Sequence, residues 1–153
     1  MTELAGARLR RVGVIHGPNL HLLGTREPEL YGATTLDGVN RALEGLAADL
    51  GVELEGVQSN HEGVLVDWIT EEAPRVAGFL VNAAGLTHTS VVLRDALLGV
   101  GRPFVEVHLS NTSARESFRH RSLLADRAVG VVYGFGVESY LLGLRGLLSH
   151  LDS

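Results

Sequence analysis

Segments with the pattern of β-strands alternate with segments of helical periodicity along the whole chain. The five predicted strands are short and apolar, and they span residues 11–17, 52–60, 76–85, 103–111 and 129–136. The helical segments repeat apolar residues every three or four positions, and they span residues 35–51, 62–73, 88–101 and 137–151. We interpret the strands as apolar on both faces, which is typical of a parallel sheet covered by helices on both sides.

The number of strands and the chain length together favour one fold class. Five strands within 153 residues predict an α/β flavodoxin-like fold, a doubly wound five-stranded parallel sheet with strand order 2-1-3-4-5, rather than a closed barrel. A chain of this length has no room for a second core of comparable size, so we expect one domain over residues 1–153. Residues 1–8 are expected to form a flexible tail, and Thr35 is placed to cap the first helix.

Charge and composition exclude several kinds of partner. With 13 Lys and Arg against 18 Asp and Glu, the chain lacks the basic surface that binds nucleic acid or anionic membranes. It has no cysteine, which excludes disulfides, thiolate catalysis and cysteine-ligated metals. No apolar run approaches the roughly 18 residues of a transmembrane helix, and the first residues lack the apolar segment of a secretory signal. We therefore expect a cytoplasmic protein.

Polar and charged residues gather in the connections that follow the predicted strands. These connections span residues 16–32, 58–63, 82–90 and 108–122, and all are rich in Asn, His, Ser or Arg. The connections at the opposite ends of the strands are short and chemically plain. Because ligands bind beyond the carboxyl ends of the strands in open α/β sheets, we expect the functional site there. The first connection is long for a compact domain, so residues 17–34 are predicted to be a functional lid.

Two patterns near the fourth predicted strand indicate acid–base and anion-binding chemistry. Glu106 and His108 are two positions apart on a strand and therefore share a face, where a carboxylate fixes the tautomer of an imidazole and stabilises its cation. Arg115 and Arg119 are four positions apart, which predicts that they lie on one face of a helical turn. A pair of guanidinium groups there suits a small oxygen-rich anion. An ordinary polar strand end and a solvated charged turn are the alternatives.

Tyr31 is the candidate base within the long first connection. A free tyrosine has a pKa near 10, so about one molecule in a thousand is ionised at neutral pH. Ionising the tyrosine at neutral pH needs about 3–4 kcal/mol of stabilisation, which a nearby guanidinium group can supply. Arg26 is five residues away. A tyrosine that packs the base of the loop is the alternative.

Several familiar site motifs are missing. His61 and His120 lack the helical spacing or the clustered carboxylates of a zinc site, so no metal is predicted. The glycines of the first connection fit neither the dinucleotide-binding pattern nor the P-loop. Nothing matches a serine nucleophile with its His and Asp partners.

Four long motifs occur in order: GPNLHLLGTREPELYG, QSNHEGVLVDWI, THTSVVLRDAL and PFVEVHLSNTSARESFRHRS. With these motifs the chain resembles, from about Arg11 to Leu148, the type II 3-dehydroquinate dehydratases, which are lyases of the shikimate and quinate pathways. The resemblance implies a role either in aromatic amino acid and chorismate biosynthesis or in quinate catabolism, because both pathways use the same reaction. The resemblance implies anti elimination of water from 3-dehydroquinate, which gives 3-dehydroshikimate through an enolate. It implies neither a metal nor an organic cofactor.

The resemblance also implies catalytic roles. Tyr31, as tyrosinate, would remove the C2 proton, and Arg26 would lower the pKa of Tyr31 and stabilise the developing charge. Asn19 would hold a water that stabilises the enolate oxygen. His108 would protonate the departing C1 hydroxyl, with Glu106 orienting the imidazole.

Substrate binding is implied for a further set of residues: Asn82, His88, Asp95, Leu109, Ser110, Arg115 and Arg119. Leu109 and Ser110 would contribute their backbone, and Asp95 would reach the site of a neighbouring subunit. The resemblance implies trimers that are grouped into a dodecamer.

The chain departs from the family pattern at a few positions. His16 stands where the family usually has Asn, and Ala83 and Leu86 stand for Pro and Tyr. Ser113 and Arg121 stand where His is common. These changes leave every implied chemical group in place, but they are expected to alter the wall around Asn82 and the surroundings of Arg115.

Two other functions follow from these observations. The first is the same chemistry on an amino analogue of dehydroquinate in secondary metabolism, and the altered wall around Asn82 is the reason to consider it. The second is a non-catalytic flavodoxin-like binding module. The presence of all six groups implied for the chemistry and the anion site argues against that module: Asn19, Arg26, Tyr31, Glu106, His108 and Arg119.

Overall fold

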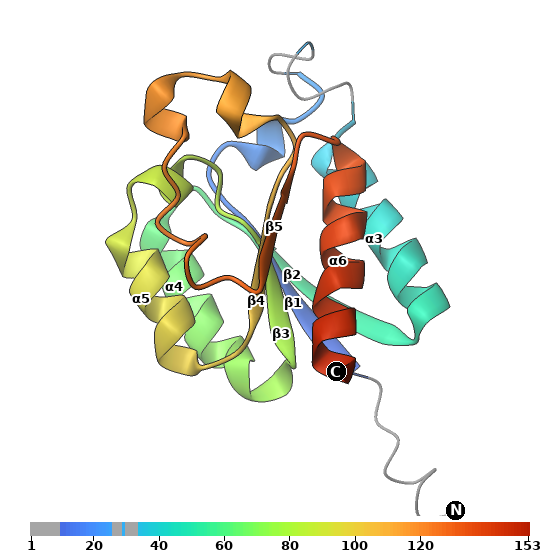
Figure 1. The fold of residues 1–153 in the computed structure, drawn as a ribbon. Coiled ribbons are helices and arrows are strands. Elements are labelled where there is room, and N and C mark those ends of the chain that lie inside the picture. The colour runs from blue at the N-terminus through green and yellow to red at the C-terminus, as the bar shows by residue number, and fades with distance from the viewer. Residues whose placement is uncertain (1–9, 26–28, 30–33) are drawn as a thin grey trace, which may run out of the picture.

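A single parallel sheet forms the centre of the molecule. The computed structural model describes residues 10–25, 29 and 34–153, so the predicted tail lies outside the described residues. The strands are β1 (Arg10–His16), β2 (Val52–Gln58), β3 (Gly78–Asn82), β4 (Phe104–His108) and β5 (Gly130–Tyr133). Every neighbouring pair is parallel and the order is β2-β1-β3-β4-β5 (Figure 1). The predicted flavodoxin-like α/β fold is confirmed.

Helices cover both faces of the sheet. The α-helices are α3 (Leu36–Leu50), α4 (Glu62–Glu72), α5 (Val91–Val100) and α6 (Val137–Asp152). Helices α3 and α6 pack together on one face, and α4 and α5 pack together on the other (Figure 1). Short 3-10 helices lie in the described connections: η1 (Leu20–Leu22), η2 (Ala73–Arg75), η3 (Ala84–His88), η4 (Thr112–Ala114) and η5 (Ser117–Arg119). None of the helices in the described ranges is both long and apolar enough to span a lipid bilayer.

Local sequence explains where α3 begins and ends. The Thr35 side chain accepts a hydrogen bond from the Gly38 N–H at 3.1 Å, so the predicted N-cap is confirmed. Gly51 ends the helix in the left-handed conformation, with φ 69°, which a residue without Cβ adopts at no steric cost. Val39 and Leu43 are buried against the sheet, as their helical spacing requires.

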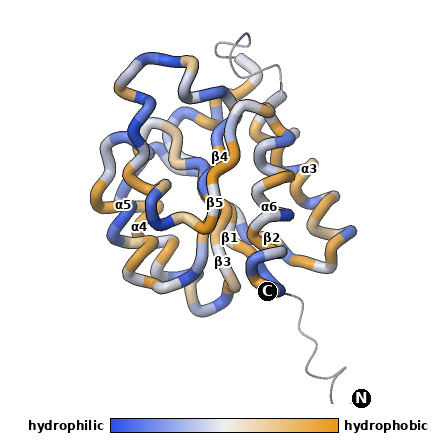
Figure 2. Tube along the Cα trace, viewed as in Figure 1, coloured by the Kyte–Doolittle hydropathy of each residue, from blue (hydrophilic) through white to orange (hydrophobic). Residues whose placement is uncertain are grey.

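The two faces of the sheet carry separate apolar cores. One core joins the sheet to α3 and α6, and the other joins it to α4 and α5. Figure 2 shows hydrophobic segments along the strands and on the helices that flank them. The expectation that the strands are apolar on both faces is correct for β3 and β4, which are buried throughout, and for most of β1. It is wrong for β2 and β5, because these strands form the two edges of the sheet and stay largely exposed.

The strand register brings the polar carboxyl ends of neighbouring strands side by side. His16 pairs with Asn82 on β3 and with Gln58 on β2, and His108 pairs with Tyr133 on β5. The chain after β1 passes close to the chain after β3: a Cβ added at Gly17 would lie 2.3 Å from the Ala83 carbonyl oxygen. A glycine is therefore required where the first connection leaves the sheet.

Candidate active site

A cavity lies at the carboxyl ends of β1, β3 and β4. Its walls come from the connections that follow these strands and from the last residue of each of β3 and β4. The lining residues are Pro18, Asn19, Leu20, Leu22, Leu23, Asn82, Ala84, Gly85, His88, His108, Leu109, Ser110, Thr112, Arg115 and Arg119. Polar and positively charged groups from distant parts of the sequence thus face one space.

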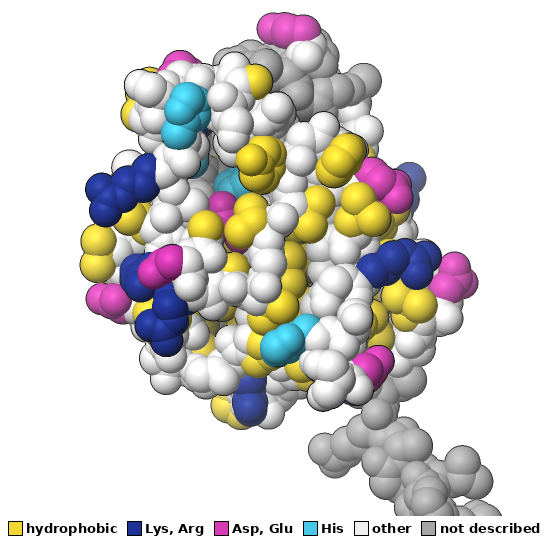
Figure 3. All heavy atoms as spheres, in the orientation of Figure 1, with side chains coloured by type: hydrophobic (Ala, Val, Ile, Leu, Met, Phe, Trp, Pro, Cys, Tyr) yellow, Lys and Arg dark blue, Asp and Glu magenta, His cyan; other side chains and the backbone are white. Residues whose placement is uncertain are grey.

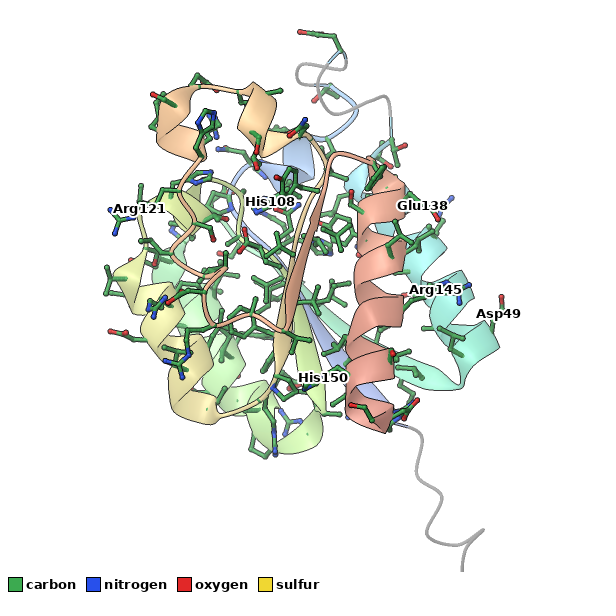
Figure 4. The ribbon with its side chains drawn as sticks, viewed as in Figure 1. Asp49, His108, Arg121, Glu138, Arg145 and His150 are labelled. Atoms are coloured by element: carbon green, nitrogen blue, oxygen red, sulfur yellow. The ribbon has the colours of Figure 1, made fainter. Side chains whose placement is uncertain are left out.

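A buried imidazole–carboxylate pair stands at the end of β4. His108 Nε2 lies 2.5 Å from Glu106 Oε2, and both residues are buried. This confirms the prediction that the two side chains share a face of the strand. Because a carboxylate only accepts hydrogen bonds, His108 carries its proton on Nε2 and keeps Nδ1 for proton exchange. Figure 4 shows His108 inside the molecule, beneath the loop that follows β4.

The other carboxylate oxygen is held by Ser122, which the sequence analysis did not identify. Ser122 Oγ lies 2.7 Å from Glu106 Oε1, and it also accepts hydrogen bonds from the N–H groups of Leu124 and Ala125, both at 3.0 Å. With two backbone donors on the hydroxyl oxygen, its single proton is available for Glu106. The arrangement therefore suits an ionised Glu106, whose two oxygens each accept a hydrogen bond.

His88 places a second imidazole beside the first. The rings of His88 and His108 are stacked, with centroids 6.5 Å apart and planes inclined by 16°. His88 Nδ1 donates to the Arg121 carbonyl at 2.7 Å, which leaves Nε2 for a ligand. The Arg121 side chain points to the outer surface (Figure 4), so this residue anchors His88 through its backbone.

Asn82 has a fixed side chain at the end of β3. Its Oδ1 accepts from the Ala84 N–H at 3.1 Å, and its Nδ2 donates to the Tyr140 hydroxyl at 3.0 Å. Ala84 has φ 52°, an uncommon conformation for a residue with Cβ, which this hydrogen bond helps to hold. The Tyr140 oxygen lies 2.9 Å from His16 Nδ1, and His16 Nε2 lies 2.9 Å from Asn40 Oδ1.

The burial of His16 predicts a loss of stability in acid. Burial lowers the pKa of His16 to about 4, although the hydrogen bond with Asn40 acts in the opposite direction. Between pH 6.5 and about 4 the unfolded chain therefore binds more protons than the folded chain. The stability that neutral His16 contributes is complete above the pKa that histidine has in the unfolded chain, and it decreases as the pH falls. The total loss is about 3 kcal/mol once the pH is below the pKa of His16 in the folded protein.

Urea unfolding between about pH 7 and pH 4, compared with the His16→Asn variant, measures this contribution. The parent protein is expected to lose more stability on acidification than the variant. Equal losses in the two proteins would contradict this assignment.

Asn19 lies where the first connection turns into the cavity. Its backbone is left-handed, with φ 70°, a conformation that asparagine tolerates better than most residues. Its N–H donates to Asn60 Oδ1 at 2.9 Å, and Gln58 Nε2 donates to the Gly17 carbonyl at 3.2 Å. The polar end of β2 therefore holds Asn19 in place, a role that the sequence analysis did not assign to Gln58 or Asn60.

Two arginines bring positive charge to the cavity. Arg115 Nη1 donates to Ser110 Oγ at 3.3 Å, and Arg119 Nε donates to Glu116 Oε1 at 2.9 Å. The pKa of Glu116 is lowered by a hydrogen bond from its own backbone and by Arg119. The predicted single helical turn is wrong, because Arg115 has extended backbone between η4 and η5. Both side chains nevertheless line the cavity.

Comparison with known proteins identifies the family. The family model described as Dehydroquinase class II matches residues 10–148. This chain belongs to the class II dehydroquinase family. It is 53% identical over 141 residues to a 3-dehydroquinate dehydratase of Geotalea daltonii, covering 92% of this chain and 98% of that protein. It is 58% identical over 141 residues to one of Prochlorococcus marinus strain MIT 9313, covering 92% and 95%.

Solved class II structures agree with this assignment. The type II dehydroquinase of Butyrivibrio crossotus superposes with a TM-score of 0.87 at 34% identity, covering 95% of this chain and 99% of that one. The enzyme of Propionibacterium acnes gives a TM-score of 0.86 at 34% identity, covering 94% and 97%.

The structure gathers most of the predicted site residues of this class II dehydroquinase around one cavity. The lining includes Asn19, Asn82, His88, His108, Leu109, Ser110, Arg115 and Arg119. Glu106 lies behind His108, and Asp95 lies on the exposed surface of α5, away from the cavity lining. Tyr31 and Arg26 lie outside the described residues.

None of the departures from the family pattern lines the described cavity. His16 and Ala83 are buried, whereas Ser113 and Arg121 are exposed. In the described part of the chain the lining next to Asn82 consists of Ala84 and Gly85, and neither Ala83 nor Leu86 belongs to it. The expectation that Ala83 and Leu86 alter the cavity wall is therefore wrong, because neither side chain belongs to the described lining.

No three His, Asp or Glu side chains within residues 10–25, 29 and 34–153 converge as a metal site would require.

Proposed function

We propose that this class II dehydroquinase converts 3-dehydroquinate to 3-dehydroshikimate by anti elimination of water, with His108 as the proton donor. The observation that carries the proposal is the buried Glu106–His108 pair at the cavity, in a chain more than half identical to 3-dehydroquinate dehydratases. Elimination of a hydroxyl next to an enolate needs an acid for the leaving group, a base for the C2 proton and donors for the enolate oxygen.

His108 meets the requirements of the acid. Glu106 and Ser122 hold the imidazole in one tautomer, so a proton on Nδ1 can pass to the C1 hydroxyl as the C–O bond breaks. Water leaves, and the imidazolium becomes neutral imidazole. The negative charge of Glu106 stabilises the imidazolium that must form before each turnover.

Replacing Ser122 by Ala is expected to lower kcat about 5- to 30-fold with little change in KM. The substitution leaves one oxygen of a buried carboxylate without its hydrogen bond, which costs about 1–2 kcal/mol. The experiment measures kcat across pH for the variant and for a Ser153→Ala control at the chain end. A parent-like kcat and an unchanged pH profile would show that Ser122 has no part in holding Glu106.

The base and the lid remain predictions from the sequence. Tyr31 would remove the C2 proton as tyrosinate, next to Arg26, within the expected lid of residues 17–34. Asn19 would hold the water that stabilises the enolate oxygen, and its position on the cavity wall supports this role.

The remaining cavity groups suit a carboxylate with several hydroxyls. Arg115 and Arg119 provide positive charge, while Asn82, His88 and the backbone after β4 provide directional hydrogen bonds. A neutral or cationic ligand would find no acidic side chain among the described lining residues.

We also propose that the chain assembles into trimers grouped as a dodecamer, with Asp95 completing a neighbouring site. Figure 3 shows hydrophobic side chains gathered over the edge strand β5 and beside it. Exposed residues in this region are Val129, Val131, Tyr133, Phe135 and Leu142, and Val91 and Val92 are exposed near Asp95 on α5. Such apolar surfaces favour burial against other copies of this chain.

The cytoplasmic location of the protein stays a prediction from the sequence.

Deuterium at C2 tests the mechanism. With 3-dehydroquinate labelled at the C2 position anti to the C1 hydroxyl, the product is expected to contain no deuterium. A product that keeps this deuterium would contradict anti elimination.

Parallel kinetics on 3-dehydroquinate and its amino analogue test which compound is the substrate. A higher kcat/KM for the analogue would overturn the assignment of 3-dehydroquinate as the substrate.

A further inference from the structure

A chain of hydrogen bonds runs from α3 to the cavity. It begins at Asn40 on α3, passes through His16 on β1 and Tyr140 on α6, and ends at Asn82 on β3. Three of the four residues are buried, and the Tyr140 side chain is fully enclosed. Only Asn82, the last member, lines the cavity.

The chemistry of the groups fixes the direction of every bond in this chain. The Asn40 carbonyl oxygen only accepts, so His16 donates from Nε2 and its Nδ1 is an acceptor. The Tyr140 hydroxyl therefore donates to His16, and its oxygen accepts from the Asn82 amide nitrogen. Burial raises the pKa of Tyr140, so its hydroxyl keeps this proton.

The planar amide of Asn82 has two orientations that differ by a half-turn, and its surroundings select one. In the observed orientation Oδ1 accepts from the Ala84 N–H and Nδ2 donates to Tyr140. A half-turn would set an amide nitrogen against the Ala84 N–H, which is repulsive. The first Nδ2 hydrogen faces Tyr140, which leaves the second for an acceptor in the cavity.

We propose that Tyr140 and His16 are positioning residues for the substrate, because they fix the Asn82 amide with one N–H directed at a substrate oxygen. This inference rests on the proposed function and deepens it, since it names residues that act on binding from outside the cavity. A phenylalanine would fill the space of Tyr140 equally well in the core. The hydroxyl is therefore explained by what it holds, rather than by packing.

Tyr140→Phe is expected to raise KM for 3-dehydroquinate about 3- to 10-fold while kcat stays within about twofold of the parent. The parent assay in the same series tests the proposed function separately, because turnover by the parent is required whatever the variant does. Tyr133→Phe is the matched control, since Tyr133 contacts Ser113 outside the cavity lining, and its KM is expected to be unchanged.

A double-mutant cycle separates positioning from general structural damage. If Tyr140 acts through Asn82, Tyr140→Phe adds little to the KM of an Asn82→Ala enzyme. If the effects of the two substitutions on KM multiply in the double variant, Tyr140 affects KM by a route other than Asn82 and the proposal is wrong. A parent-like KM for Tyr140→Phe alone would overturn it equally.

Two substitutions of His16 keep the test decisive if Tyr140→Phe folds poorly. His16→Asn retains a hydrogen-bond acceptor near the position of Nδ1 and is expected to keep KM close to the parent value. His16→Leu has similar volume and no acceptor, and is expected to raise KM as Tyr140→Phe does. An equal KM for both His16 variants would contradict the role of His16 as the acceptor for Tyr140.

Discussion

Replacing His108 by Asn is expected to reduce kcat about 100- to 10,000-fold, the usual contribution of a positioned general acid. The asparagine amide can occupy the place of the imidazole and hydrogen bond to its neighbours, but it cannot deliver a proton to the C1 hydroxyl. KM is expected to stay within a few-fold of the parent value, because most of the groups that line the cavity are unchanged.

His150→Asn provides the matched control. His150 is exposed near the end of α6, far from the cavity, as Figure 4 shows. This variant is expected to keep parent kinetics. A His108→Asn enzyme with more than about a tenth of the parent kcat would show that another group protonates the leaving hydroxyl.

Tyr31→Phe is expected to reduce kcat about 100- to 10,000-fold, the usual contribution of a positioned general base. Only the ionisable oxygen is removed, so binding of the product 3-dehydroshikimate is expected to persist. Calorimetric titration with 3-dehydroshikimate and steady-state kinetics measure the two properties independently. Substantial residual turnover would identify a different base.

Tyr133→Phe is the control for Tyr31 as well, because it removes the same atom from a tyrosine outside the cavity lining. Parent-like kinetics of this variant would show that loss of a phenolic oxygen alone is harmless.

The sequence predicted the fold because its local patterns agree with the final packing. Apolar runs and helical repeats mark nearly every element, and Thr35 and Gly51 set the ends of α3. The errors occur where tertiary position overrides local pattern. The edge positions expose β2 and β5, and the chain after β4 folds as two 3-10 turns instead of the single helical turn predicted for Arg115 and Arg119.

The candidate site was predictable where its residues are close in sequence. Glu106 and His108 are two positions apart, and strand geometry alone places them together. Ser122 is 16 positions from Glu106, and Tyr140 is 124 positions from His16, so no spacing rule connects them. Ser122 stands within a motif that carried the family resemblance, which was the available signal. Tyr140 belongs to the helical repeat of residues 137–151, a pattern that indicates only an apolar helix face.

If this chain dehydrates 3-dehydroquinate with its own side chains alone, its turnover requires no metal ion. The most direct test is a steady-state assay of the purified protein with 3-dehydroquinate and a chelator, which follows the conjugated enone of the product. We predict turnover that is unchanged by the chelator. A folded protein that forms no enone, or that loses its activity with the chelator, would contradict dehydration by the side chains of this protein alone.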